Sequence, residues 1–282
     1  MDLPRKVIGI PNAEYHAQND FDGRSFIWSV YKGGGAAQEW LDQGHRLFEG
    51  NNATSLGTDF DGLIMGLCEG KSVDDILVVA PADCLSANGQ RRGKAWDEFK
   101  AQCEAENKIP CSDEHYFRLA TMSDSLMSCP PSRRCVEETN ETQVSVFFEH
   151  DGHRLKVRPD GCTPTYWWDL KTTSSDWDTL YRSILTYGYH AQEWLYVRGA
   201  MALGMEWFRM PFVFVRSAPP FDCRCFYLPV ELVTEAGRIM ERTLREIRLR
   251  RSTGVYMPAD HGEITELPIP QWAMRSEEEV SI

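Results

Sequence analysis

Long apolar runs are missing from this sequence of 282 residues. No stretch approaches the roughly 18 consecutive apolar residues that a membrane-spanning helix needs, so we expect no transmembrane helix. The N-terminal segment 1–16 also lacks the long apolar stretch of a secretory signal. The sequence therefore predicts a cytoplasmic protein without a membrane partner.

Compact cysteine motifs are missing as well. The nine cysteines are scattered along the chain, and no C-x-x-C pair occurs, which argues against a structural zinc site. No compact run of three cysteines follows a distant fourth, so we expect no iron–sulfur cluster. The pattern favours reduced, mostly buried thiols in a reducing compartment.

Positive charge is in deficit. The chain has 30 Lys and Arg against 42 Asp and Glu, a formal net charge of −12. Such a balance ordinarily argues against nucleic acid as a partner, but the basic residues are clustered in segments 90–94 and 238–251. Each cluster is either a solvated surface or a face that contacts phosphates, and composition does not decide between the two.

The chain contains no internal repeat and no low-complexity linker, and its 9 tryptophans supply bulky core material. We expect one domain over 1–282, with a mostly helical part over 1–140, a core over 141–252 and an extension over 253–282. Apolar periodicity and breaker residues predict helices in the first part over 25–47 (interrupted at 33–35), 58–67, 93–106 and 113–128.

The pattern changes near residue 141. β-branched and aromatic residues over 143–149 precede Asp151-Gly152, a strong hairpin signal, and a returning strand is expected over 153–159. The remaining elements expected are strands over 165–171, 211–216 and 223–230, and helices over 176–185, 189–203 and 231–251. This order predicts an α/β (α+β) fold with a mixed β-sheet flanked by helices.

The segment that suggests chemistry is Arg158-Pro159-Asp160, followed after eight residues by Asp169-Leu170-Lys171-Thr172-Thr173. Side chains alternate along a strand, so Asp169 and Lys171 share a face and Leu170 lies on the other. Asp160, at the end of the neighbouring strand, could lie beside Asp169. Two adjacent carboxylates suit a Mg²⁺ or Mn²⁺ ion, and a lysine beside them could orient or deprotonate a water and neutralise charge on a phosphate. The alternative is a surface salt-bridge ladder.

The next helix adds Gln192 and Tyr196, which lie four residues apart and so on one face. Taken alone they fit an ordinary amphipathic helix. Directly after a strand that ends in Asp-x-Lys-Thr-Thr, they favour a site built from the strand and the helix together.

This arrangement resembles the PD-(D/E)XK nuclease superfamily and, within it, the RecE-like (exonuclease VIII-type) phage and prophage exonucleases. The resemblance spans nearly the whole chain, and its nuclease core is more specific than its outer motifs. Beyond the segments already given, the matching motifs are Ile10-Pro-Asn-Ala-Glu-Tyr-His16, Leu56-Gly-Thr-Asp-Phe-Asp61, Val79-Ala-Pro81, Asn88-Gly-Gln-Arg-Arg-Gly-Lys-Ala-Trp96, His190-Ala-Gln192, Phe212-Val-Phe-Val215 and Pro270-Gln-Trp-Ala273.

The resemblance implies a role for each matching residue and a restriction-endonuclease-like fold. Asp160 and Asp169 would bind Mg²⁺ or Mn²⁺ together with the Leu170 carbonyl, and Lys171 would be the catalytic lysine. Gln192 and Tyr196, which share one helix, would support the active site and the DNA strand. The DNA-binding residues implied in the same way are Arg91, Arg92, Lys94, Thr172 and Thr173, with simple solvation as the alternative for the basic three.

Two positions depart from the family pattern. Asp61 stands where the family has a metal-binding histidine, and it is either a further metal ligand or a solvated carboxylate on a helix face. Gln143 aligns with a glutamate of the first core strand and would bind a cation weakly. Glu149 is a poor substitute because it lies at the far end of that strand. The number of metal ions, and catalytic competence itself, therefore stay open.

The resemblance implies a metal-dependent exonuclease that digests linear duplex DNA from 5′ to 3′ and leaves 3′ single strands for a RecT-like annealing protein. Such enzymes form ring-like homo-oligomers, in which an acidic exterior can coexist with a basic channel. One alternative is a DNA-end-binding or assembly module that keeps the nuclease fold without activity. A RecB-like nuclease with an iron–sulfur cluster is a further alternative that the cysteine spacing disfavours.

Overall fold

The computed structural model of the chain describes residues 2–45, 52–86, 91–257, 264 and 266. Its helices are α1 (Asn12–His16), α2 (Arg24–Asp42), α3 (Asn52–Cys68), α4 (Val73–Ile76), α5 (Lys94–Ala105), α6 (Asp113–Ser128), α7 (Pro130–Glu138), α8 (Leu180–Tyr187), α9 (Tyr189–Ala202) and α10 (Val230–Thr253), with a 3-10 turn at Ala82–Cys84. Its strands are β1 (Arg5–Val7), β2 (Asp22–Gly23), β3 (Leu77–Val79), β4 (Ile109–Cys111), β5 (Glu141–Thr142), β6 (Ser145–His150), β7 (His153–Val157), β8 (Gly161–Cys162), β9 (Trp167–Thr173), β10 (Phe212–Arg216) and β11 (Cys223–Phe226).

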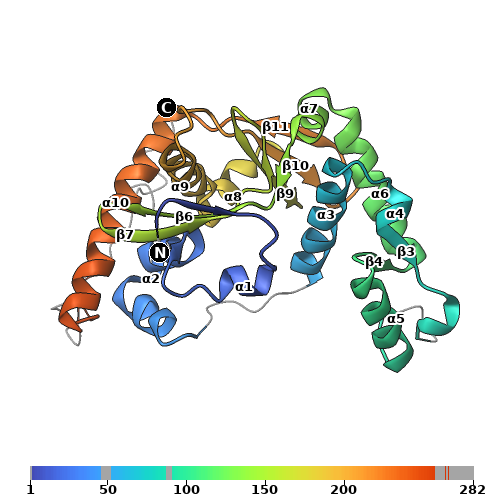
Figure 1. Cartoon of the computed structure of the whole chain (residues 1–282), viewed down its shortest axis with the longest axis horizontal. Helices are drawn as coiled ribbons and strands as arrows, with labels where there is room; N and C mark the ends of the chain where they lie inside the picture. The colour runs from blue at the N-terminus through green and yellow to red at the C-terminus, as the bar shows by residue number, and fades with distance from the viewer. Residues whose placement is uncertain (1, 46–51, 87–90, 258–263, 265, 267–282) are drawn as a thin grey trace, which may run out of the picture.

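The strands form two mixed sheets and a small ladder. One sheet has the order β1-β6-β7-β2, the second has the order β11-β10-β9-β8-β5, and β3 pairs with β4. In the second sheet β9 is parallel to β10 and antiparallel to β8. Figure 1 shows these sheets between α10 at one end of the molecule and the helices α3 to α7 at the other. The predicted α/β (α+β) class with a mixed sheet is confirmed.

The predicted hairpin is confirmed at its turn. Asp151 and Gly152 have φ angles of 49° and 72°, the left-handed pair that a two-residue turn with the twist of the flanking strands requires. The strands on either side, β6 and β7, pair from Val146 opposite Val157 to His150 opposite His153. The helix expected over 25–47 is α2, and it kinks at Gly34, within the glycine run where an interruption was expected.

One prediction about strand order is wrong. The hairpin strand β7 pairs with β6 and β2, and the antiparallel neighbour of β9 is the two-residue strand β8. Asp160 therefore precedes the strand next to β9 instead of ending it. A strand of two residues has no readable alternation, so the sequence offers no periodic signal for β8.

Two hydrophobic cores lie on opposite faces of β9 and β10. Phe212 and Phe214 belong to the core that α9 and α10 cover, whereas Leu170, Val213 and Val215 belong to the core formed with α3 and α6. The register pairs Leu170 with Val213, so these two side chains lie on the same face. The face that carries Phe212 and Phe214 also carries Asp169 and Lys171.

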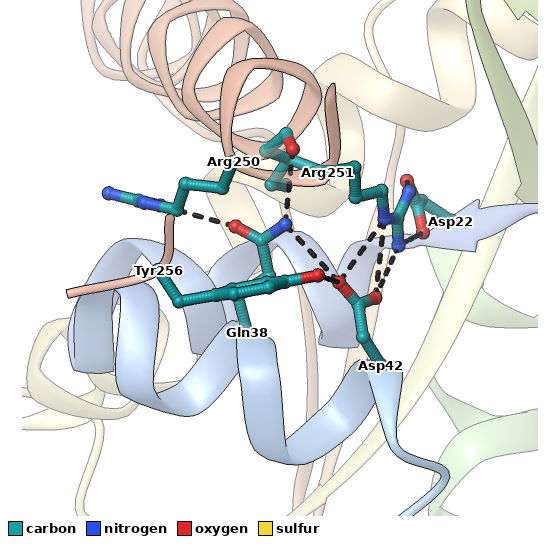
Figure 2. Close-up of polar contacts among 7 residues, drawn as sticks. Asp22, Gln38, Asp42, Arg250, Arg251 and Tyr256 are labelled. Carbon is teal, nitrogen blue, oxygen red and sulfur yellow. Dashed lines mark hydrogen bonds and ion pairs between the residues drawn. The ribbon is translucent and has the colours of Figure 1, made fainter. Parts of the chain in front are cut away.

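A polar cluster joins the C-terminal helix α10 to α2 and β2 (Figure 2). Arg251 contacts both oxygens of the buried Asp22 at 2.7 and 2.9 Å, and it reaches Asp42 Oδ1 at 2.7 Å. The amide of the fully buried Gln38 donates to the Ile247 carbonyl at 3.1 Å. Arg250 and Arg251, two arginines of the 238–251 cluster, thus attach α10 to α2 and β2.

No helix in the described ranges combines the length and the apolar character needed to cross a membrane. The closing motif 270–273, the basic-loop residues 88–90 and most of the 253–282 extension lie outside the described residues.

Candidate active site

Strand β9 carries two charged side chains on the sheet face that α9 covers. Asp169 and Lys171 point to the face that carries Phe212 and Phe214, and Leu170 packs into the core on the opposite face. The predicted alternation along this strand is confirmed. The Asp169 side chain is 3% exposed and that of Lys171 18%, so the lysine reaches the surface while the carboxylate does not.

Asp160 reaches the site from the loop that joins β7 to β8. Gly161 pairs with Trp168, which brings the preceding residue, Asp160, opposite Asp169. The Asp160 Oδ2 accepts the backbone N–H of Leu170 at 2.7 Å. A Cβ at position 161 would overlap the buried Trp168 indole ring, so only glycine allows this close approach of the two strands.

Lys171 is held by three groups. Its Nζ donates to Asp169 Oδ2 and to the Leu170 carbonyl at 3.3 Å. The same ammonium lies 5.1 Å from the centre of the Tyr189 ring, at the start of α9, in a cation–π contact. The ammonium is therefore oriented by the backbone and by an aromatic face as well as by its carboxylate partner.

Helix α9 supplies the two residues that the sequence analysis paired. Gln192 Nε2 donates to Asp169 Oδ1, and both side chains are buried. Tyr196 donates its hydroxyl to the Arg158 carbonyl at 3.0 Å, just before Asp160. One face of α9 thus contacts both carboxylate-bearing segments. The Gln192 Oε1 is buried and has no hydrogen-bond partner among the residues that the structure describes.

Asp61, on α3, interacts electrostatically with the charged groups of Asp160, Asp169 and Lys171. Burial raises the pKa of Asp61 to about 7, with the Lys171 ammonium lowering it and Asp169 raising it further. Burial likewise raises the pKa of Asp160, and both Asp169 and Asp61 add to that rise. For Lys171, burial lowers the pKa, but the carboxylates of Asp169 and Asp160 outweigh it and leave the pKa above its ordinary value. Three carboxyl groups thus surround the single ammonium of Lys171. A second cation would stabilise the charged forms of these carboxyls.

The donor set fits a hard divalent ion. The groups that could hold one are the carboxylates of Asp61, Asp160 and Asp169 and the Leu170 carbonyl, all oxygen ligands. The Lys171 ammonium already contacts two of these groups, Asp169 and the Leu170 carbonyl, so a positive charge is accommodated there. In the described parts of the chain the three aspartates do not gather their oxygens within 4.8 Å of one another, so ion binding would draw them closer.

Gln143 takes a different place from the one the resemblance suggested. Its side-chain Oε1 accepts from Arg158 Nη2 at 3.3 Å, and its backbone N–H donates to the Asp160 carbonyl at 3.0 Å. It therefore positions the Asp160 loop instead of presenting its amide to the carboxylates. Glu149 is exposed at the far end of β6, as expected.

The residues predicted to bind DNA lie in two places. Arg92 and Lys94 are exposed at the start of α5, and Arg91 is half-buried, 3.6 Å from Asp59 and over the Trp96 ring. Thr172 is half-buried, while Thr173 is buried and its hydroxyl accepts the Ser175 N–H. Of this set, Arg92 and Lys94 present the most accessible positive charge.

Sequence reasoning missed a cationic support behind the site. Arg158 donates to the Ile10 carbonyl at 2.8 Å and stacks over the Tyr15 ring. Its Nε and Nη1 are buried and have no hydrogen-bond partner within the described part of the chain. Lys156 is buried and donates to the carbonyls of Tyr15 and Gln18 at 3.0 and 2.9 Å. The N-terminal motif therefore packs against β7 beside the carboxylates. The Arg-Pro-Asp motif carries the signal for this support, because its arginine lies two residues before the aspartate.

Comparison with known proteins supports the fold. No protein-family model matches the sequence, and no curated protein matches it. The crystal structure of a candidate exonuclease from Eubacterium rectale is similar, with a TM-score of 0.60 at 14% identity over 96% of this chain and 100% of that one. A Vibrio cholerae protein aligns over 88% of this chain and 58% of its own, with 12% identity and a TM-score of 0.20, too low to carry an argument. The chain thus shares its fold with the Eubacterium rectale protein.

Proposed function

We propose that this protein is a metal-dependent DNA exonuclease. The observation that carries the proposal is the hydrogen-bonded set of Asp160, Asp169, Lys171 and Gln192, built where two strands and α9 meet. The likeness to a candidate exonuclease of the same fold adds support. A preference for linear duplex ends, 5′→3′ polarity, 3′ single-strand products, a ring-like homo-oligomer and a RecT-like partner follow from the resemblance to RecE-like enzymes.

Each residue of the site has its own role in the proposed hydrolysis of the phosphodiester. The chemistry supplied by a bound Mg²⁺ or Mn²⁺ is Lewis-acid polarisation of the scissile phosphate. Because the pKa of Lys171 is raised, its side chain stays an ammonium at neutral pH. It is partly exposed, so it can donate to a phosphate oxygen and neutralise the negative charge that develops there.

Two groups fix the carboxylates for this role. Gln192 holds Asp169 Oδ1, whose other oxygen accepts from Lys171, and the Leu170 N–H holds Asp160 Oδ2. The contact between Gln192 and Asp169 is buried, and the low polarity of its surroundings strengthens it. The strand and the helix therefore orient one oxygen of each carboxylate before substrate arrives.

The test is digestion of end-labelled linear duplex DNA with and without Mg²⁺ or Mn²⁺, beside a closed circular duplex. We expect metal-dependent loss of the linear DNA alone, and the position of the label gives the polarity. Endonucleolytic cutting of the circle would contradict the preference for ends, and digestion in the presence of a chelator would contradict metal dependence.

A second candidate is a DNA-end-binding module that keeps the fold without hydrolysis. The commitment of the Gln143 amide to Arg158 favours it, because the resemblance requires a glutamate ligand at that position. In this case the purified chain would bind linear duplex DNA in a gel-shift assay, yet give no products with either metal.

A further inference from the structure

Three half-buried thiols that are far apart in the sequence meet at the edge of the second sheet. The sulfur atoms of Cys129, Cys223 and Cys225 all lie within 4.8 Å of one another. In the described residues no other group of three His, Cys, Asp or Glu ligands is so close. All nine cysteines of the chain are free thiols, and four of them are fully buried, fewer than the sequence predicted.

Local structure brings the three sulfurs together. Cys223 and Cys225 alternate with Arg224 on β11, and the register sets them opposite Val215 and Val213, so both point to the face packed against α6 and α7. Cys129 occupies the junction between these two helices, where it ends α6 and begins α7. The strand β11 thus supplies two of the thiols, and the junction between α6 and α7 supplies the third.

The junction is built rigidly. Pro130 follows Cys129 in the first turn of α7, where the fixed φ of proline suits a helix start. The Ser132 hydroxyl donates to the Cys129 carbonyl at 2.9 Å and to the Leu126 carbonyl at 2.6 Å. The same Ser132 oxygen accepts from the Cys223 thiol at 3.4 Å. One buried serine therefore ties the helix junction to the strand that carries the other two thiols.

We propose that Cys129, Cys223 and Cys225 form a zinc site of three thiolates. Zinc–sulfur bonds of about 2.3 Å in a tetrahedral arrangement place the sulfurs roughly 3.8 Å apart. The sulfurs of the cluster lie within 4.8 Å of one another, which is close to that spacing. Binding breaks three S–H bonds and forms three Zn–S bonds, with the protons released to solvent. The cluster supplies three ligands, so a solvent molecule would take the fourth position.

This zinc site is separate from the site of the aspartates. Cys225 pairs with Val213, which pairs with Leu170, so the thiols lie on the sheet face opposite Asp169 and Lys171. The two sites also differ in chemistry, because sulfur ligands select Zn²⁺ whereas carboxylate oxygens select Mg²⁺ or Mn²⁺. The inference does not rest on the proposed nuclease activity.

The expected role is to hold the helical part of the chain on the sheet. β11 is the edge strand of its sheet, and a metal bound between it and the α6–α7 junction would fix that edge. The ion would stabilise the folded chain because the three ligands come together only when the protein is folded.

The experiment uses the full chain, reduced and stripped of metal, and titrates it with Co²⁺ as a spectroscopic substitute for Zn²⁺. We expect one ion per chain with a thiolate-to-metal charge-transfer band, displaced by Zn²⁺, and a melting temperature about 5 °C higher with Zn²⁺. The band should weaken severalfold in Cys225→Ser and in Cys129→Ser. It should persist in Cys84→Ser, a half-buried cysteine outside the cluster.

Three experimental results would overturn the proposed zinc site. Absence of the charge-transfer band in the wild-type protein would overturn the proposal, and so would an equal band in Cys225→Ser. Formation of a disulfide within the cluster in place of metal uptake, detected as a mass loss of two hydrogens, would also overturn it. Circular dichroism of each variant shows whether it is folded, and the wild-type titration is decisive even if a serine variant does not fold. DNA digestion under Mg²⁺ is scored separately.

Discussion

The Asp160 carboxylate accepts the backbone N–H of Leu170 at 2.7 Å. This bond crosses from the loop before β8 to the middle of β9, the strand that carries Asp169 and Lys171. The relation between the two carboxylates therefore follows from the pairing of β8 with β9 and from this bond.

Gly161→Ala should disturb the site without touching a charged residue. Its Cβ would overlap the Trp168 ring, which is fully buried and cannot move freely. We expect a loss of about 1–3 kcal/mol in the free energy of unfolding, the usual cost of overpacking, and a fall in hydrolysis because Asp160 is displaced. Urea unfolding and DNA digestion measure the two effects.

The matched control is Gly23→Ala. Gly23 has a φ of −102°, and an added Cβ would meet Lys156 at an ordinary contact of 3.7 Å. It should change both measurements much less than Gly161→Ala. Equal effects of the two substitutions would refute the argument from the Trp168 contact.

Asp61 should make metal use depend on pH near neutrality. Its pKa is raised to about 7, so the carboxylate prevails above that pH and the neutral acid below it. A metal ligand must be deprotonated, so less Mg²⁺ should be needed for half-maximal digestion as pH rises from 6 to 8. Asp61→Asn should need more Mg²⁺ at every pH and show a flatter dependence. An unchanged profile in that variant would exclude Asp61 as a ligand.

Glu193 should make the stability of the fold fall as pH rises. This carboxyl is buried in α9, and burial raises its pKa to about 7, against the opposing effects of the Met210 N–H and Arg209. Its folded-state pKa lies above the ordinary value of 4.5, so the folded chain holds the proton longer than the unfolded one. The free energy of unfolding should decrease between about pH 4.5 and pH 7, by up to about 3 kcal/mol from this group.

Glu193→Gln tests that pH dependence. The amide keeps an acceptor for the Met210 N–H, which lies 3.1 Å from Oε1, and removes the charge. The variant should be more stable than the wild type at pH 8 and closer to it at pH 4.5, measured by urea unfolding. Glu206→Gln, at an exposed position, is the control. A difference between Glu193→Gln and the wild type that does not vary with pH would argue against the raised pKa.

Arg251→Ala should weaken the attachment of α10. Arg251 neutralises Asp22, which is buried, and Asp42, so its removal leaves a buried carboxylate without its cation. Because the arginine is 40% exposed, we expect a moderate loss of about 1–3 kcal/mol in the free energy of unfolding. Arg238→Ala, which breaks an exposed ion pair with Glu235, should cost under about 1 kcal/mol. Comparable losses in the two variants would refute the importance of the cluster in Figure 2.

The sequence predicted the parts of the site that depend on local periodicity. Alternation along β9 placed Asp169 and Lys171 on one face, and helical spacing placed Gln192 and Tyr196 together on α9. The hairpin turn followed from the left-handed preferences of Asp151 and Gly152. In each case the information lies within a few neighbouring residues.

What the sequence missed depends on contacts between distant segments. Strand β8 is two residues long and carries no alternation, so the true neighbour of β9 was not foreseen. The sequence also gives no clear signal for helix α7. This helix begins at Pro130-Pro131, and a proline pair is typical of a break between elements as well as of a helix start. The cysteine cluster joins a helix junction to an edge strand, and a search for C-x-x-C spacing does not detect such a site.

The central claim is that the set around Lys171 carries out phosphodiester hydrolysis. The most direct test is the single-turnover rate of linear duplex digestion for Lys171→Ala, with Lys71→Ala as the control because the ion pair of Lys71 with Glu69 is exposed. We predict a fall of about 10²-fold or more for Lys171→Ala, with its folding intact, and no change for Lys71→Ala. Digestion by a folded Lys171→Ala protein at the wild-type rate would contradict the assignment of this site.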